Sequence, residues 1–120
     1  MIAIEINGVS MNFETLPTLF SPNGLDAGTR AMLSSAQFSQ EDKILDLGCG
    51  YGAVGIYAAK LIRDKNVTMT DIDKTAILIA QENARLNGVP NIRFLQSDGF
   101  RSIDDTGYTV ILSNPPYHSD

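Results

Sequence analysis

The segment 43–55 constrains the fold more than any other part of the chain. It reads KILDLGCGYGAVG, an apolar run followed by three glycines at alternate positions and then by a helix-compatible stretch. Glycine lets the backbone turn sharply and lets a ligand lie against bare main chain. The first turn of a helix beyond such a loop offers free N–H groups. The segment therefore predicts a strand, a glycine loop and a helix that together form a ligand site.

The rest of the chain continues this alternation of strands and helices. We expect strands at 43–47, 66–70, 92–95 and 108–113, and helices at 53–63 and 73–87. Asp73 can cap the second of these helices, and Gly88 and Pro90 can end it. Apolar strands that alternate with helices predict a parallel sheet with right-handed crossovers, hence an α/β fold.

A different pattern precedes this core. Asn7-Gly8 lies between two alternating apolar runs, 2–6 and 9–13, which is a strong signal for a two-residue β-hairpin. A loop and then a helix at 26–37, capped by its first residue, are expected to follow. The expected organisation is a single domain at 1–120, with the hairpin and loop at 1–24 and the cofactor-binding α/β core at 25–120.

Carboxylates at the ends of the first two core strands narrow the class of ligand. Asp71 lies 21 residues after Gly50, and an acid at that place in a βαβ unit suits the two hydroxyls of a ribose. Gly48-x-Gly50-x-x-Ala53 also satisfies the dinucleotide fingerprint, which is weak by itself. However, Asp46 would face a pyrophosphate with a like charge. The same carboxylate suits S-adenosylmethionine, which carries an ammonium, a sulfonium and a ribose but no phosphate, so we favour that cofactor over NAD.

A second motif directly follows the last expected strand. It is Asn114-Pro115-Pro116-Tyr117. Proline fixes φ and donates no backbone hydrogen bond, so the turn is stiff and its carbonyls are free to accept. An amide side chain, a carbonyl and a ring can together grip a planar amine, such as an exocyclic base NH2 or a carboxamide. The plain alternative is a strand end followed by a proline turn.

In combination, these motifs resemble the ordered motifs of class I S-adenosylmethionine-dependent methyltransferases. The resemblance rests on the DLGCGYG loop, Asp71, Ser97-Asp98 and the Asn-Pro-Pro-Tyr motif, which is typical of enzymes that methylate amino nitrogens. The segment FSPNGLDAGT at 20–29 is similar to the methyltransferase small domain group, which includes ribosomal RNA guanine-N2 methyltransferases. The resemblance covers most of the chain and implies a Rossmann-like sheet with the core strands in the order 3-2-1-4.

The resemblance also implies roles for individual residues. For the cofactor it implies Gly48, Gly50 and Gly52 at the methionine part, Asp46 at the ammonium, Asp71 at the ribose, and Ile72, Asp98 and Gly99 at the adenine. For the acceptor, Asn114 would orient the target amine, the Pro115 carbonyl would take its second hydrogen, and Tyr117 would stack on its plane. Methyl transfer is a direct displacement, so positioning carries most of the catalysis. His118, the only histidine, would contact the acceptor, act as a base or have no role.

Most of these residues also have a plain structural interpretation. The glycines would form a strand–helix turn, Asp46 would be a solvated or capping group, Asp71 a turn residue, Ile72 a core residue, and Ser97–Gly99 a common turn. The expected function is methylation of an amino nitrogen. Guanine N2 of ribosomal RNA is the favoured acceptor, and adenine N6 or a protein glutamine amide is the less favoured one. A truncated, non-catalytic cofactor-binding or assembly remnant is the alternative.

The chain looks short against the family it resembles. It stops seven residues after its last expected strand, so the later strands and helices of the family fold would be missing. The last strand would then be an edge with unpaired backbone groups, exposing Val110 or Ile111. We therefore expect poor or absent activity of this form and a homodimer through that edge.

The charge composition limits how this chain could bind a nucleic acid. The net charge is -5 and the nine Lys and Arg residues form no run, whereas nucleic-acid binding through phosphates usually needs a basic patch. If RNA is the substrate, its backbone would be held by residues outside this chain. The single Cys49 cannot form an internal disulfide and is expected to pack. The sequence predicts a cytoplasmic protein with no metal site and no membrane association.

Overall fold

The computed structural model describes residues 1–16, 25–103 and 106–113. Its elements are β1 (Ile2–Ile6), β2 (Val9–Phe13), α1 (Ala27–Ser35), β3 (Ile44–Leu47), α2 (Ala53–Leu61), the 3-10 turn η1 (Asp64–Asn66), β4 (Val67–Asp71), α3 (Lys74–Leu86), β5 (Arg93–Gln96) and β6 (Val110–Ser113). The four core strands pair in parallel in the order β5-β4-β3-β6. The expected α/β fold and strand order are therefore confirmed.

Strand β3 is one of the two inner strands of the sheet. It pairs with β4 on one side and with β6 on the other, so that Leu47 lies opposite both Thr70 and Ser113. Ile44, Leu45 and Asp46 are fully buried, as expected for a parallel strand that is covered on both faces. The carboxyl ends of the strands meet at one edge, which is where ligands bind in open α/β sheets.

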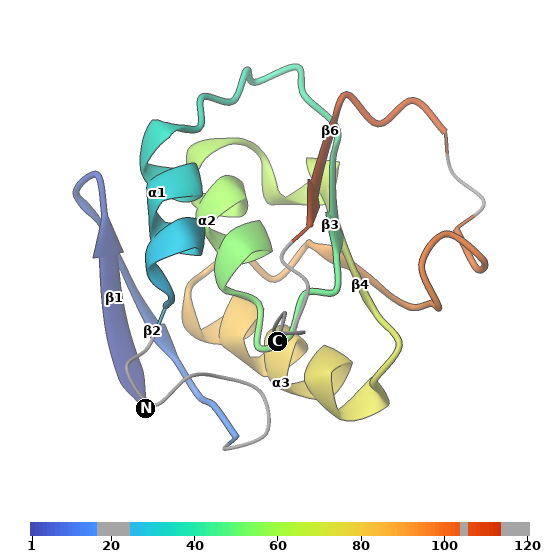
Figure 1. The fold of residues 1–120 in the computed structure, drawn as a ribbon, viewed down its shortest axis with the longest axis horizontal. Helices are drawn as coiled ribbons and strands as arrows, with labels where there is room; N and C mark the ends of the chain where they lie inside the picture. Colours follow the sequence, from blue (N-terminus) through green and yellow to red (C-terminus); the bar gives the residue numbers. More distant parts are fainter. Residues whose placement is uncertain (17–24, 104–105, 114–120) are drawn as a thin grey trace.

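Helices α2 and α3 lie side by side on one face of the sheet (Figure 1). Gly55 allows α2 to approach closely, because a Cβ atom there would lie 2.5 Å from Met69 Cε and 3.0 Å from Asp46 Oδ2. A methyl group at this position would therefore overlap buried atoms of β3 and β4.

The helix caps follow the sequence prediction, and some element ends differ. Asp26 accepts from Thr29 N at 2.7 Å at the start of α1, and Asp73 accepts from Thr75 N at 2.9 Å at the start of α3. Strand β6 begins two residues later than expected. The N–H groups of Thr109, just before the strand, and of Val110, its first residue, both donate to the Lys43 carbonyl, so the regular ladder starts only at Val110.

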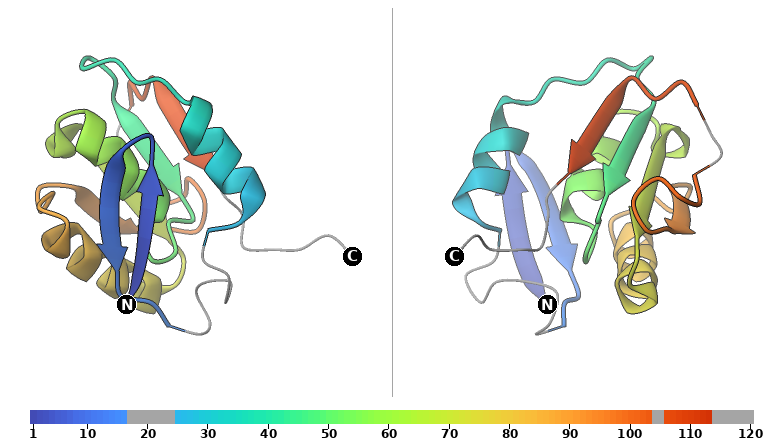
Figure 2. Two further views of the ribbon diagram at one scale, coloured as in Figure 1. Left: turned by 90° about the vertical axis from the view of Figure 1, so that its left-hand side faces the viewer. Right: turned by 45° about the vertical axis from the view of Figure 1, so that its right-hand side comes forward.

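The N-terminal hairpin is present as expected and packs on the helices. Asn7 and Gly8 both have positive φ, 51° and 82°, as a type I′ turn requires. Figure 2 shows the hairpin outside the helical layer, so that the helices lie between it and the sheet. In the turn, Asn7 Nδ2 donates to Ser34 O at 2.9 Å and to Tyr57 Oη at 3.1 Å, which ties the hairpin to α1 and α2.

Candidate cofactor site

A pocket opens at the carboxyl ends of β3, β4 and β5. It is lined by Leu47, Gly48, Thr70, Asp71, Ile72, Ser97, Asp98 and Gly99. Its volume of about 160 Å³ is below the roughly 300–1,000 Å³ of typical ligand pockets. The described residues therefore enclose only part of a ligand of cofactor size.

The glycine loop contributes Gly48 to the lining of this pocket. Gly48, Gly50 and Gly52 have φ values of 71°, 56° and 104°, a region that other residues rarely adopt. Cys49 N donates to Thr70 O at 2.8 Å and Gly52 N donates to Cys49 O at 2.9 Å, which fixes the loop against β4. A Cβ atom on Gly48 would meet no atom within 4 Å. At Gly48 the loop thus presents bare main chain to open space, which fits a ligand that lies against it, whereas a Cβ atom on Gly52 would lie 3.1 Å from Ile56 Cδ1.

Asp71, the last residue of β4, holds two backbone segments at once. Its Oδ2 accepts from Gly50 N and its Oδ1 accepts from Asp73 N, both at 2.9 Å. The residue is half-buried and lines the pocket. Each carboxylate oxygen has a second lone pair, so these bonds leave acceptor capacity for the hydroxyls of a ribose.

Asp46 lies below the glycine loop and is fully buried. Its Oδ2 accepts from Gly55 N at 3.0 Å, in the first turn of α2. The N-cap of α2 is Gly52, which has no side chain to make such a bond, so Asp46 supplies from β3 the acceptor that a capping residue normally provides. Among the described residues no donor reaches Asp46 Oδ1. Burial, and secondarily the charge of Asp71, raise the pKa of Asp46 to about 7, although the Gly55 bond opposes this.

The loop after β5 also contributes to the lining of the pocket. Ser97 organises it, because Ser97 Oγ donates to Gly99 O at 2.7 Å and accepts from Ser102 N at 3.1 Å. Asp98 is mainly exposed and its carboxylate lies 4.0 Å from Arg101 Nε. Ile72 is 63% exposed at the mouth of the pocket. An exposed apolar residue beside a carboxylate suits a flat heterocycle with an amino group.

The pocket brings together some of the predicted cofactor residues. Gly48, Asp71, Ile72, Asp98 and Gly99 all line it. Asp46, Gly50 and Gly52 are not among its lining residues, and their contacts with a cofactor stay predictions. The pocket also contains three residues to which the sequence analysis gave no role in the site, Leu47, Thr70 and Ser97. Each of these three residues lies at the end of an expected strand or just beyond it, and this position is the sequence feature that could have predicted them as pocket residues.

The predicted acceptor residues Asn114, Pro115 and Tyr117 lie outside the described residues, as does His118. The described chain ends at Ser113 of β6, which lies opposite Leu47 in the sheet. Because Leu47 lines the pocket, the strand that precedes the Asn-Pro-Pro-Tyr motif ends beside the candidate site.

Three other predictions, on Cys49, on metal binding and on membrane association, concern residues that the structure describes. Cys49 is buried, and burial raises the pKa of its thiol far above the ordinary range, which fits a packing role. Within residues 1–16, 25–103 and 106–113, no group of His, Cys, Asp and Glu side chains is arranged to hold a metal ion. In the same ranges, no helix has the length and apolar character needed to cross a membrane.

Comparison with known proteins agrees with this geometry. The profile of the family described as Methyltransferase small domain matches residues 10–120. The chain belongs to this family. Methyltransferases of the class to which it belongs use S-adenosylmethionine, so the cofactor prediction is confirmed for the family. The bare glycine loop and the carboxylates of Asp71 and Asp98 fit that cofactor.

Sequence relatives of the chain include enzymes named for ribosomal RNA. The chain is 32% identical over 115 residues to the Ribosomal RNA small subunit methyltransferase C of Colwellia psychrerythraea, covering 96% of this chain and 32% of that protein. It is 37% identical over 116 residues to the uncharacterized protein YbxB of Bacillus subtilis, covering 95% of this chain and 58% of that protein. The chain thus spans between about a third and three fifths of these relatives.

Solved structures show the same fold. The tRNA (uracil-54, C5)-methyltransferase of Pyrococcus abyssi, in complex with S-adenosyl-L-homocysteine, has a TM-score of 0.68 and 26% identity, covering 95% of this chain and 28% of that one. An RNA methyltransferase of Salinibacter ruber, also with S-adenosyl-L-homocysteine, has a TM-score of 0.61 and 30% identity, covering 72% of this chain and 56% of that one.

Proposed function

We propose that the chain is the cofactor-binding core of an S-adenosylmethionine-dependent methyltransferase that acts on an amino nitrogen, first of all guanine N2 of ribosomal RNA. One observation carries this proposal. The pocket that contains Asp71 and Asp98 lies at the carboxyl ends of the sheet, beside the strand that leads into Asn114-Pro115-Pro116-Tyr117. The end of β6, after which the motif suited to a planar amine follows in the sequence, thus lies beside the groups proposed to bind the cofactor.

The described residues would bind and orient the cofactor. Asp71 would accept from the ribose hydroxyls, and Asp98 would accept from the adenine amino group while Ile72 packs on the ring. The glycine loop would hold the methionine part, with the Asp46 carboxylate beneath it near the ammonium. The bound cofactor supplies an electrophilic methyl group on sulfonium, so the chain needs no nucleophile of its own and contributes by positioning.

The acceptor would be held by the motif after β6. Asn114 and the Pro115 carbonyl would take the two amine hydrogens, and Tyr117 would stack on the acceptor plane. This arrangement would leave the nitrogen lone pair free to attack the methyl carbon in line. An extruded base and a carboxamide share this planar amine, which is why several acceptors are compatible with the motif.

The names of the relatives favour RNA over protein as the acceptor. Several are named Ribosomal RNA small subunit methyltransferase C. One is the Release factor glutamine methyltransferase of Fusobacterium nucleatum, which is 43% identical over 81 residues, covering 67% of this chain and 23% of that protein.

The net charge of -5 implies that phosphate contacts come from residues outside this chain. A cofactor-binding module without turnover is the alternative.

Titration calorimetry tests cofactor binding. We expect S-adenosylmethionine and S-adenosylhomocysteine to bind and NAD to bind more weakly or not at all, since Asp46 disfavours a pyrophosphate near the loop. Tighter binding of NAD than of both methionine-derived ligands would refute the proposal.

Transfer of a radiolabelled methyl group tests turnover. Small-subunit ribosomal RNA and a glutamine-containing release factor peptide would be offered separately to the 120-residue chain. We expect at most weak incorporation, into RNA, and its loss in Asn114→Ala. Cofactor binding with no incorporation into either acceptor would favour the module without turnover, and incorporation into the peptide alone would exclude RNA as the preferred acceptor.

A further inference from the structure

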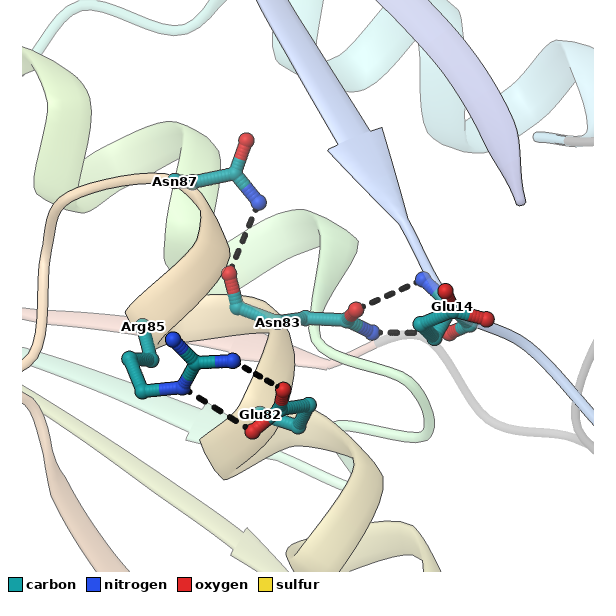
Figure 3. Close-up of polar contacts among 5 residues, drawn as sticks. All are labelled: Glu14, Glu82, Asn83, Arg85 and Asn87. Atoms are coloured by element: carbon teal, nitrogen blue, oxygen red, sulfur yellow. Dashed lines mark hydrogen bonds and ion pairs between the residues drawn. The ribbon is translucent and has the colours of Figure 1, made fainter.

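The buried side chain of Asn83 joins three parts of the molecule. It projects from α3 and is fully buried. Its Oδ1 accepts from Glu14 N at 2.7 Å and its Nδ2 donates to Glu14 O at 2.8 Å, directly after β2 (Figure 3). The same Nδ2 donates to Tyr51 O at 2.7 Å, within the glycine loop. One amide therefore connects the end of the hairpin to the loop of the candidate cofactor site.

Asn87, the C-cap residue of α3 and one turn after Asn83, makes a closely similar set of bonds. Its Oδ1 accepts from Asn12 N at 3.0 Å and its Nδ2 donates to Asn12 O at 2.8 Å. Asn12 and Glu14 are alternate residues, so the two amides bond to backbone groups along one edge of β2, much as a neighbouring strand would. The second bond of Asn87 Nδ2 goes to Asn83 O at 2.7 Å, within α3 itself. The two asparagines thus differ mainly in that Asn83 reaches the glycine loop.

An aromatic contact connects the hairpin and the loop independently. The rings of Phe13 and Tyr51 lie edge to face, with centroids 5.4 Å apart and planes at 72°. Phe13 is fully buried in β2 and Tyr51 is 7% exposed. Tyr51 lies between Gly50 and Gly52, two residues whose φ is positive. Its ring and its carbonyl are therefore both fixed, the ring by the hairpin and the carbonyl by Asn83.

We propose that the N-terminal hairpin is a positioning element for the cofactor loop, and that Asn83 is the positioning residue that couples them. Glycine-rich backbone has many accessible conformations, and Tyr51 is where Asn83 and the hairpin hold this loop. Fixing its carbonyl and ring sets the orientation of the Gly50 and Gly52 peptides. The consequence for cofactor affinity rests on the function proposed above, whereas the consequence for loop order does not.

Asn83→Asp and Asn87→Asp form a matched pair of variants. Each replaces an NH2 that donates to two carbonyls by an oxygen that repels them, and each keeps the acceptor for a hairpin N–H. Both substitutions loosen β2 from α3, but only Asn83→Asp removes the bond to Tyr51 O. A purely structural role predicts equal effects of the two variants once their stabilities are taken into account.

The experiment combines amide hydrogen exchange of the free protein with calorimetry of S-adenosylhomocysteine. We expect Asn83→Asp to accelerate exchange at Gly50 and Gly52 and to raise the Kd by about fivefold or more, the usual lower range for coupling between sites. Asn87→Asp should leave both quantities within about twofold of wild type at matched stability. Equal exchange in the two variants at these glycines would overturn the proposal.

A second pair keeps the test decisive if Asn83→Asp does not fold. Phe13→Leu removes the ring that contacts Tyr51, whereas Met11→Leu alters another buried residue of β2 and serves as its control. We expect only Phe13→Leu to accelerate exchange in the glycine loop, and unchanged exchange in both would overturn the proposal. If the wild-type chain binds neither methionine-derived ligand, the proposed function fails, while the exchange data still decide whether the hairpin positions the loop.

Discussion

Replacing Asp46 by Asn should make the protein more stable at alkaline pH and leave it nearly unchanged in acid. The Asp46 carboxyl is fully buried, and burial raises its pKa from 3.8 to about 7. Between these two values the folded chain binds a proton that the unfolded chain has lost, so stability falls as pH rises through that window. Each pKa unit corresponds to about 1.4 kcal/mol, so ionised Asp46 destabilises the fold by up to about 4 kcal/mol above pH 7.

An asparagine avoids this penalty because it stays neutral. Its side-chain oxygen can still accept from Gly55 N, the bond that Asp46 makes now, and its NH2 takes the place of the protonated oxygen. Urea unfolding of both proteins at several pH values between 4 and 8 measures the difference. Asp98→Asn, at a mainly exposed carboxylate, is the control for a general charge effect and should give curves parallel to wild type.

The result that would refute this reasoning is a constant stability difference between wild type and Asp46→Asn across the whole range. The carboxyl would then titrate as in water despite its burial. The same measurement with saturating S-adenosylmethionine tests the predicted ammonium contact. A cation near Asp46 favours the ionised form, so the fall in stability with rising pH should flatten in wild type, and an unchanged slope would place the ammonium elsewhere.

Three further outcomes are expected. Asp71→Ala should weaken binding of S-adenosylhomocysteine by about 1.5–3 kcal/mol in calorimetry, the scale for hydrogen bonds to a charged group; an unchanged affinity would remove Asp71 from the site. Gly55→Ala should lower the free energy of unfolding in urea by about 1–3 kcal/mol, because its Cβ would lie 2.5 Å from Met69 Cε; a neutral effect would mean that α2 shifts freely. Ile111, 51% exposed on β6, should mediate self-association, so light scattering should show a dimer that Ile111→Lys converts to monomer, and a wild-type monomer at all concentrations would contradict this.

Local signals in the sequence were sufficient for most of the fold. Asn7-Gly8 predicted the hairpin because its turn depends only on two residues that tolerate positive φ. Asp26 and Asp73 predicted helix starts because a cap acts within three residues. The parallel sheet followed from the alternation of apolar strands and helices, and its order followed from the family resemblance.

The packing around the candidate cofactor site could not be predicted from local sequence signals of this kind. Nothing local to Asp46 distinguishes a carboxylate that faces a ligand from one that accepts from α2, because Gly55 lies nine residues away and reaches it only in the folded sheet. Asn83 carried no signal either, since its partners Glu14 and Tyr51 lie 69 and 32 residues away. Polar side chains that bond to distant backbone are recognised only when the topology places them together.

The distance along the chain between the hairpin and its asparagine partners has a consequence for folding during synthesis. The hairpin is made first, but its contacts from Asn12 to Asn87 span 75 residues. An isolated two-stranded hairpin is at best marginally stable in water, and the bonds that join the hairpin to Asn83 and Asn87 can form only after α3 has been synthesised. Because long-range contacts form late and slow folding, the glycine loop should acquire its final shape only after most of the sheet is in place. A ribosome-bound chain that stops before residue 83 should therefore contain a formed β3–α2–β4 unit whose cofactor loop is still disordered.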